Sequence, residues 1–226
     1  MKKIVVLTGA GISAESGIKT FRGADGLWEG YSIHDVATPE AWERNPELVL
    51  TFYNERRKQL LTVEPNIAHK LLTKLEETYD VTIITQNVDD LHERARSKNV
   101  IHLHGELRKV RSTQNESLIY NWDINLKLGD MCHKNSQLRP HIVWFGEAVP
   151  NLSIAEEITQ RADILLIIGT SLQVYPAANL IYHCNQGIPI YFIDPNPNIE
   201  ESYFKNLTVI KETATKGMEI VLNKLV

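Results

Sequence analysis

Cysteine is scarce in this sequence of 226 residues, which contains only Cys132 and Cys184. Two cysteines are too few for a disulfide scaffold, and so low a number is typical of a reducing compartment, so we expect a cytoplasmic protein. Long apolar runs are also missing. The run that follows Lys2 and Lys3 stops at Gly9, too soon for a signal peptide or a membrane-spanning helix.

The sequence also lacks any concentration of basic charge. It has 24 lysines and arginines against 28 acidic residues, a net charge of -4, and no run of like charges. Such a chain offers no strong positive field to a phosphate backbone or an anionic lipid surface, so we predict neither a nucleic-acid nor a membrane partner. An apolar content of 43% with 23% charged residues fits a globular chain with a sizeable core.

Five short apolar runs are present, and each ends in glycine or polar residues. They cover residues 4–7, 81–84, 100–103, 164–168 and 188–193. Stretches with helical spacing lie between them, which predicts an α/β fold: a Rossmann-like parallel sheet with helices on both faces. Ligands of such folds bind where the strands end, so one crevice is expected to collect the residues after each run. These are Gly9 to Ser13, Gln86 to Asp89, His104 and Gly105, Gly169 to Ser171, and Asp194 to Asn196.

Two stretches depart from this alternation, and we interpret them as a small lobe inserted into a single domain of residues 1–226. One covers approximately residues 31–74 and is helical in pattern; the other, approximately 106–147, is polar and irregular as far as His141. The large lobe then comprises approximately residues 1–30, 75–105 and 148–226. Trp122, Leu126, Leu128 and Met131 are the residues expected to pack the small lobe.

The first run leads into a glycine-rich segment, residues 9–14, which matches the pattern G-x-G-x-x-G/A. The first glycine permits a tight turn, the second lets the backbone approach a pyrophosphate, and Ala14 lets a helix pack near the strand. An ordinary strand-to-helix turn is the alternative, but the position after a strand favours a nucleotide site. A dehydrogenase would usually show an acid closing a second strand about 20 residues on. Here Asp25 lies in a loop-like stretch, which disfavours hydride transfer.

Two histidines near the third run are candidates for a general base, since an imidazole with a pKa of about 6.5 suits proton transfer near neutrality. His102 and His104 share strand parity, so alternation does not choose between them. His104 lies nearer the end of the strand and precedes Gly105, so it is better placed in the crevice. Asn87 and Asp89 follow the preceding run and are expected at the same ligand.

Five motifs occur in the order and spacing of the sirtuin family, and the sequence resembles that family over nearly its whole length. They are Gly9-Ala10-Gly11-Ile12-Ser13, Thr20-Phe21-Arg22, Thr85-Gln86-Asn87-Val88-Asp89, His104-Gly105 and Gly169-Thr170-Ser171. The resemblance implies a catalytic domain that cleaves NAD as a co-substrate and deacylates acyl-lysine proteins or peptides. The products would be nicotinamide, O-acyl-ADP-ribose and free lysine.

The same resemblance implies roles for individual residues. His104 would be the base that activates a ribose hydroxyl, and Asn87 would orient the nicotinamide. Asp194 stands where the family usually has asparagine at the adenosine ribose. The residues implied at the cofactor are Gly9, Ala10, Gly11, Ser13, Ala14, Thr20, Phe21, Arg22, Trp28, Gln86, Asn87, Val88, Asp89, Gly169, Thr170, Ser171, Asp194, Pro195, Asn196 and Ala214.

The acyl pocket is expected on a helix predicted over residues 46–62, where Tyr53 and Arg56 lie three apart and therefore on one face. By themselves they fit an amphipathic surface pair. With Ala37 they match the sirtuin subgroup that resembles bacterial desuccinylases and removes malonyl, succinyl and related acyl groups. Arg56 would bind the acyl carboxylate through two parallel bonds, and Tyr53 would add a hydroxyl donor.

Residues 141–147 resemble the segment that lines the sirtuin substrate channel, where an extended peptide would pair by strand addition. The substrate contacts implied there are Val143, Phe145, Gly146 and Glu147.

The sequence departs from the family in its small lobe, where sirtuins commonly carry a four-cysteine zinc site. Such a site needs two cysteine pairs, but only Cys132 lies in this region, with His133 and His141 as further donors. We therefore predict no zinc and no other metal.

Other functions stay open on the sequence alone. An ADP-ribosyltransferase would use the same cleavage of NAD, and a non-catalytic NAD-binding module would need the same crevice. His104 favours deacylation over both alternatives. The sequence identifies neither the protein substrates nor the rank order of acyl groups, and for the oligomeric state a monomer is favoured.

Overall fold

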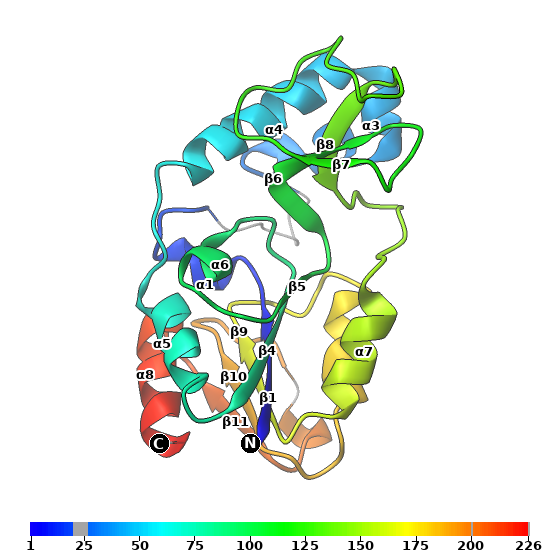
Figure 1. Cartoon of the computed structure of the whole chain (residues 1–226). Coiled ribbons are helices and arrows are strands. Elements are labelled where there is room, and N and C mark those ends of the chain that lie inside the picture. The colour runs from blue at the N-terminus through cyan, green and yellow to red at the C-terminus, as the bar shows by residue number, and fades with distance from the viewer. Residues whose placement is uncertain (20–26, 200, 226) are drawn as a thin grey trace.

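The computed structural model describes residues 1–19, 27–199 and 201–225, and it has two lobes (Figure 1). Thr20, Phe21 and Arg22, which the sequence places at the cofactor, lie outside the described residues. The larger lobe contains β1 (Lys3–Thr8), α1 (Gly11–Ala14), α5 (Ile67–Leu75), β4 (Asp80–Thr85), α6 (Leu91–Arg94), β5 (Val100–His102), α7 (Leu152–Gln160), β9 (Ile164–Ile168), η2 (Ala177–His183), β10 (Ile190–Ile193), η3 (Glu201–Tyr203), β11 (Leu207–Ile210) and α8 (Ala214–Leu225). The smaller lobe contains β2 (Leu27–Trp28), β3 (Tyr31–Ser32), α2 (Ile33–Val36), α3 (Pro39–Arg44), α4 (Pro46–Leu60), β6 (Gly105–Ser112), β7 (Ile119–Asn121) and β8 (Leu138–Ile142).

The larger lobe is built on a parallel sheet, which confirms the predicted α/β fold. Within the described ranges its six strands lie in the order β11-β10-β9-β1-β4-β5, and every neighbouring pair is parallel. Numbered along the chain, this is the order 3-2-1-4-5-6 of dinucleotide-binding sheets, with the direction of winding reversing between β1 and β9. Ile4 of β1 is accordingly paired with Val81 on one side and Ile164 on the other.

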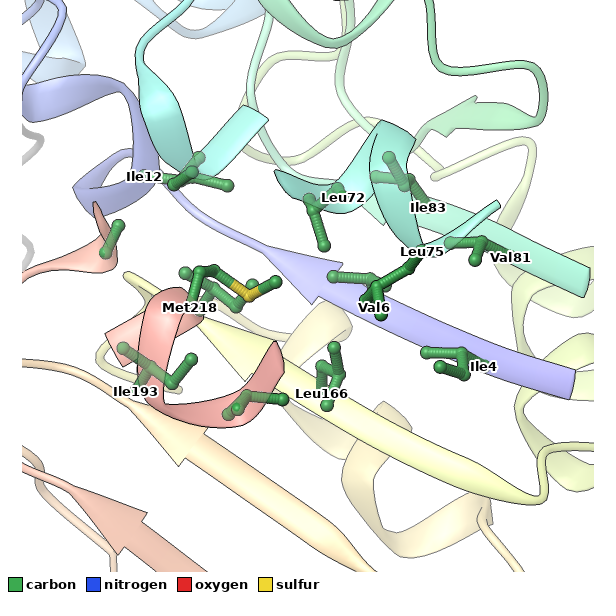
Figure 2. Close-up of a cluster of buried hydrophobic side chains, with 14 of the residues drawn as sticks. Ile4, Val6, Ile12, Leu72, Leu75, Val81, Ile83, Leu166, Ile193 and Met218 are labelled. Atoms are coloured by element: carbon green, nitrogen blue, oxygen red, sulfur yellow. The ribbon is translucent and has the colours of Figure 1, made fainter. Parts of the chain in front are cut away.

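Both faces of this sheet are covered, which explains why its strands read as continuous apolar runs. Ile4 and Val6 point to the face where α5 and α8 contribute Leu72 and Met218 (Figure 2). Val5 and Leu7 point to the opposite face and pack in a second cluster with residues of α7 and η2. Figure 1 shows α5 and α8 on one side of the sheet and α7 on the other. None of the helices in the described ranges is long and apolar enough to cross a membrane.

Helix α5 belongs with the larger lobe. Its residues Ala68, Leu72 and Leu75 are fully buried in the sheet's core cluster. The small-lobe range of approximately 31–74 predicted from the sequence therefore includes a helix that packs on the large sheet. Its helical pattern could not reveal which lobe it packs against.

The smaller lobe combines helix α4 with an antiparallel sheet. Helix α4 begins at Pro46, as predicted, with Asn45 accepting a hydrogen bond from the Leu48 amide at its N-terminus. The sheet has the order β7-β6-β8, where the sequence suggested an irregular stretch. These strands do not appear in the sequence as apolar runs, because they bury polar residues as well, among them Arg111 and Arg139.

The packing of this lobe differs from the prediction at two positions. Leu126 is 1% exposed and Trp122 packs against the same cluster, but Leu128 and Met131 are 47% and 53% exposed. The reason is that residues 127–130 form a turn toward solvent after Leu126. Helix and sheet are instead joined by Arg57, whose Nε donates to the Leu107 carbonyl at 2.9 Å.

Candidate active site

A cavity of about 480 Å³ lies between the lobes, where strands β1, β4, β9 and β10 end. This is the place that the strand order marks for a ligand. The structure brings together there most of the residues that the sequence placed at the cofactor: Gly9, Ala10, Gly11, Ala14, Trp28, Gln86, Asn87, Val88, Asp89, Gly169, Thr170, Ser171, Asp194, Pro195, Asn196 and Ala214.

Three glycines let the backbone segments after β1 and β9 touch. The Gly11 amide donates to the Gly169 carbonyl at 2.8 Å, and Gly169 has a φ of +63°, in the left-handed region. A Cβ on Gly11 would lie 2.5 Å from the Gly169 Cα, and one on Gly9 would lie 2.7 Å from its oxygen. The floor of the cavity therefore consists of bare backbone, which fits the close approach that a pyrophosphate requires.

Ser13 lies beneath this floor rather than on it, since it is fully buried and does not line the cavity. Its hydroxyl donates to Asp89 Oδ2 at 2.9 Å and accepts from Asn87 Nδ2 at 3.2 Å. Asn87 Nδ2 also donates to the Gly9 carbonyl at 3.1 Å. Both Nδ2 protons are used in this way, and no partner for the side-chain oxygen of Asn87 is found among the residues that the structure describes.

Burial raises the pKa of Asp89 to about 6, against the opposing hydrogen bonds from the Leu91 amide and the Ser13 hydroxyl. Asp89 is 6% exposed and is one of the residues that line the cavity. It can therefore accept a hydrogen bond from a ligand hydroxyl, and it changes charge close to neutral pH.

The structure separates the two candidate histidines. His102 Nδ1 faces the Asn87 carbonyl at 3.1 Å, and its Nε2 faces Glu93 Oε1 at 2.7 Å. Both partners only accept, so both ring nitrogens carry protons. Burial lowers the pKa of His102, but the hydrogen bond and charge of Glu93 outweigh burial and raise it. A histidine held as a cation cannot act as a base.

His104 has the opposite arrangement and borders the cavity. Its Nδ1 lies 3.0 Å from the Gln86 carbonyl oxygen, which fixes the proton on Nδ1 and leaves the lone pair of Nε2 available. Burial lowers the pKa of His104, with the Gln86 carbonyl opposing it. The ring is therefore neutral at pH 7 and able to take a proton.

The far side of the cavity is formed by residues after β9 and β10. Gln86 Nε2 donates to the Thr170 hydroxyl at 3.0 Å, which joins the ends of β4 and β9. Asp194 Oδ1 accepts from the Asn196 amide at 2.8 Å, and no partner for the second oxygen is found among the described residues. Burial raises the pKa of Asp194.

The end of the cavity in the smaller lobe is lined by Ala37 and Tyr53, together with Val143, Phe145, Gly146 and Glu147. The Tyr53 hydroxyl accepts from Trp144 Nε1 at 3.1 Å, and Tyr53 is fully buried from solvent. The Phe145 amide donates to the Ala37 carbonyl at 3.0 Å, which holds the channel segment against α2.

Arg56 is not among the residues that line the cavity. Its Nη1 donates to the Phe52 carbonyl at 2.7 Å, and its guanidinium lies 3.8 Å from the centroid of the Phe52 ring. Phe52 precedes Arg56 by one helical turn, so the side chain folds back along α4. The guanidinium is nevertheless incompletely satisfied, because Nε is buried without a hydrogen-bond partner among the described residues.

Glu147 lines the cavity, but its carboxylate is already engaged. Arg139 Nη1 donates to Oε1 at 2.6 Å, Arg111 Nη2 to Oε2 at 3.2 Å, and the Trp144 amide to Oε2 at 2.8 Å. Burial raises the pKa of Glu147, but the hydrogen bond and charge of Arg139 outweigh it and lower the pKa. Its place in this structure is to hold the turn over residues 144–147, and a direct substrate contact through the carboxylate is not indicated.

Several lining residues carry no motif that sequence reasoning could use, among them Ile18, Lys19, Val149, Val174, Tyr175 and Thr213. Glu15 also lines the cavity and accepts from the Thr215 amide at 2.9 Å, which ties the end of α1 to the start of α8. These two residues are 200 positions apart, so no local pattern joins them.

Within the described ranges, no group of three or more His, Cys, Asp or Glu side chains is arranged to hold a metal ion. Cys132 Sγ instead lies 3.1 Å from the Ser136 hydroxyl, which in turn lies 2.7 Å from the Ser112 hydroxyl. This cluster fastens the segment before β8 to the end of β6.

The chain is similar to known proteins of one family. A model described as the Sir2 family matches residues 9–176. A protein of Helicobacter pylori named NAD-dependent protein deacylase is 56% identical over the whole chain and 98% of its own length. One of the same name from Bacteroides thetaiotaomicron is 51% identical over 97% of this chain and 96% of its own.

Two solved structures extend the comparison. A Sir2 homologue in complex with NAD is 41% identical, with a TM-score of 0.88 over 99% of this chain and 89% of its own. A Sir2 protein bound to an acetylated peptide is 32% identical, with a TM-score of 0.81 over 98% and 92% of the two chains.

Proposed function

This chain belongs to the Sir2 family and is an NAD-dependent protein deacylase, and we propose that it acts preferentially on lysines that carry an acidic acyl group such as succinyl or malonyl. Acetyl-lysine would be a second, poorer substrate. The observation that carries the proposal is the composition of the cavity wall in the smaller lobe. The small Ala37 and Tyr53 line the cavity there, with Arg56 one turn along the same helix as Tyr53.

NAD would be held over the glycine floor, with Asp194 and Thr170 on the far side and Asn87 and Asp89 on the near side. A Sir2 homologue of the same fold solved in complex with NAD supports NAD as the ligand. When bound, NAD supplies an ADP-ribosyl group that accepts the acyl group as nicotinamide leaves. We propose that the side-chain oxygen of Asn87 orients the nicotinamide end, because the Ser13 and Gly9 contacts prevent the amide from turning.

His104 would move the proton that this reaction requires. Its Nε2 takes a proton from a ribose hydroxyl, while the Gln86 carbonyl keeps Nδ1 protonated and the ring in place. A base is most effective when it is neutral at the working pH, and burial keeps the pKa of His104 below its usual value.

Arg56 would bind the acyl carboxylate after leaving the Phe52 carbonyl and the exposed Glu55 carboxylate, which its Nη1 contacts at 2.7 and 3.0 Å. Two parallel hydrogen bonds to the acyl carboxylate would replace contacts made through Nη1 alone, and charge-assisted bonds contribute about 1.5–3 kcal/mol each. The buried Nε gains the partner that it lacks among the described residues. Acetyl-lysine ends in a methyl group and offers no such exchange.

The experiment that tests the proposal compares one peptide carrying succinyl-lysine, malonyl-lysine or acetyl-lysine, with and without NAD. The measurement is kcat/KM for each acyl group by mass spectrometry of the peptide and of the ADP-ribose product. We expect NAD-dependent removal of succinyl to be faster than removal of acetyl, with O-succinyl-ADP-ribose as product. Faster removal of acetyl would refute the acidic pocket, and ADP-ribose attached to the peptide would indicate transferase activity instead.

A further inference from the structure

We propose that Trp144 determines acyl specificity: its indole N–H donates to the oxygen of Tyr53 and so commits the Tyr53 hydroxyl to donate its own proton to the acyl carboxylate. This inference rests on the proposed preference for acidic acyl groups and adds a residue that acts through Tyr53. Trp144 is thus a positioning residue.

The chemistry of the two groups sets the direction of this hydrogen bond. An indole nitrogen can only donate, so at 3.1 Å the Tyr53 oxygen must accept from Trp144 Nε1. The hydroxyl has one proton, which then has to point away from the indole. Among the described residues no acceptor for that proton is found, and Tyr53 is one of the residues that line the cavity. A ligand carboxylate would supply the acceptor.

Tyr53 can serve as a donor only while it keeps its proton. Burial raises the pKa of Tyr53 well above its usual value of 10, so the hydroxyl is neutral at every pH of interest. A neutral hydroxyl that already accepts one bond is polarised toward donating, since hydrogen bonds in a chain strengthen one another.

Contacts with Arg139 and Glu147 hold Trp144 in the orientation that directs its N–H at Tyr53. The guanidinium of Arg139 lies 3.3 Å from the centroid of the indole ring, and Arg139 Nη2 also donates to the Ile142 carbonyl at 3.1 Å. Glu147 anchors both ends of the arrangement by accepting from Arg139 and from the Trp144 amide. A cation over the ring face draws on its electron density, which favours donation from the N–H at the ring edge.

The test replaces Trp144 with phenylalanine, which keeps an aromatic ring beneath Arg139 and removes the N–H. The measured quantity is the ratio of kcat/KM for succinyl-lysine to that for acetyl-lysine, because a general loss of activity cancels in it. We expect Trp144→Phe to lower the ratio about five- to tenfold, as the loss of one hydrogen bond of about 1 kcal/mol predicts. Trp42→Phe is the control, since Trp42 packs against Trp144 with ring centroids 5.9 Å apart but makes no bond to Tyr53.

A double-variant cycle separates this role from simple packing. In a Tyr53→Phe background there is no hydroxyl to orient, so adding Trp144→Phe should leave the ratio unchanged. If the ratio falls equally with and without the Tyr53 hydroxyl, or if Trp144→Phe leaves the ratio of the wild-type enzyme unchanged, the inference is wrong. Should Trp144→Phe not fold, β-(3-benzothienyl)alanine at position 144 retains the shape of tryptophan without the N–H, and the same outcomes apply.

The outcomes also separate this inference from the proposed function. If the wild-type enzyme prefers acetyl-lysine, the proposed substrate class fails before Trp144 is tested. If the wild-type enzyme prefers succinyl-lysine and Tyr53→Phe lowers the ratio while Trp144→Phe does not, only the role of Trp144 fails.

Discussion

Arg56 and Arg57 are neighbours in the sequence, yet α4 directs them to different partners. Arg57 is 1% exposed and reaches β6 through the Leu107 carbonyl, with Nη1 donating to Asn54 Oδ1 at 2.8 Å. Arg56 turns back onto Phe52 of its own helix and lies one turn from Tyr53. The same residue type therefore has a structural position and a candidate substrate-binding position side by side.

This pair gives a matched prediction. We expect Arg57→Met to lower the free energy of unfolding by about 2 kcal/mol or more, because the buried Leu107 carbonyl loses its partner. Arg56→Met should leave the unfolding temperature within a few degrees and lower the succinyl-to-acetyl ratio of kcat/KM about 30-fold, the equivalent of 2 kcal/mol. Thermal unfolding and the peptide assay measure the two effects. Equal losses on both acyl groups would mean that Arg56 is structural.

His104→Ala should reduce kcat by a factor of 10² to 10⁴, the usual contribution of a general base, and leave NAD binding largely intact. Calorimetry measures NAD binding, and His133→Ala, at an exposed position outside the cavity, is the control. Loss of NAD affinity together with activity would argue that His104 holds the ligand rather than a proton.

The pH profile tests the same residue in the wild-type enzyme. Because burial lowers the pKa of His104 from 6.5, the base stays deprotonated as the pH falls through 6.5, and activity is lost only below that value. The measurement is kcat/KM between pH 5 and pH 9. An acid limb centred above pH 6.5 would contradict the neutral, buried ring.

Gly169→Ala tests the backbone contact beneath the ligand. Both Gly169 and Gly129 have positive φ, +63° and +94°, so alanine is strained at either position. A Cβ on Gly129 meets nothing within 4 Å, whereas one on Gly169 would overlap the backbone of Gly11. We expect Gly129→Ala to cost about 1 kcal/mol, the strain alone, and Gly169→Ala to cost clearly more and to abolish NAD binding. Similar unfolding temperatures for the two variants would show that the glycine floor is not tightly packed.

Two buried histidines predict how stability depends on pH. The rings of His69 and His92 lie 4.9 Å apart, and both residues are fully buried. Burial lowers the pKa of His69 to about 4 and also lowers that of His92. The unfolded chain takes up protons below pH 6.5 while the folded rings stay neutral, so stability falls as the pH drops from 7 toward 4. Asp89 acts in the opposite direction, because its raised pKa of about 6 lets the folded protein bind a proton first.

The measurement is the free energy of unfolding at pH 7 and pH 5 for the wild-type protein and for His69→Gln. Removing one neutral buried histidine should reduce the pH-dependent loss by about 1–2 kcal/mol. The control is His34→Gln at an exposed position, which should retain the wild-type loss. If His69→Gln retains it as well, His69 takes up its proton in the folded state.

The smaller lobe has Cys132 as its single cysteine, which leads to a prediction about metal content. Because Cys132 bonds to Ser136 rather than to a second thiol, we propose that the smaller lobe folds without zinc. Dialysis against a chelator should leave the unfolding temperature and the activity unchanged, and elemental analysis should find well under one zinc per chain. Unfolding on chelation would overturn the proposal.

The larger lobe was predictable because its strands are buried on both faces. Ile4 to Leu7 alternate between two core clusters, so every residue of that run is apolar and the strand is obvious in the sequence. The location of the site was predictable as well, because parallel strands bring the residues at their carboxyl ends to one edge of the sheet. His104 and Asn87 both line the cavity there, as predicted, although strand alternation alone could not choose between His104 and His102.

The smaller lobe resisted prediction for the converse reason. Its sheet carries charge into the interior, with Arg111 and Arg139 sharing Glu147, so the strands read as polar loops. The direction of Arg56 depends on the carbonyl of Phe52, and the bond from Trp144 to Tyr53 joins residues 91 positions apart. Contacts of this kind leave no periodic trace in a sequence.

The central position of β1 has a consequence for synthesis of the chain. Strand β1 is synthesised before both of its neighbours and can pair with β4, but its other edge stays unpaired until β9 appears, about 80 residues after β4. At translation rates of about 5–20 residues per second, this interval lasts roughly 4–16 s. For that time the nascent chain exposes an unpaired apolar edge in what will be the middle of its sheet, the state in which a molecular chaperone would bind it.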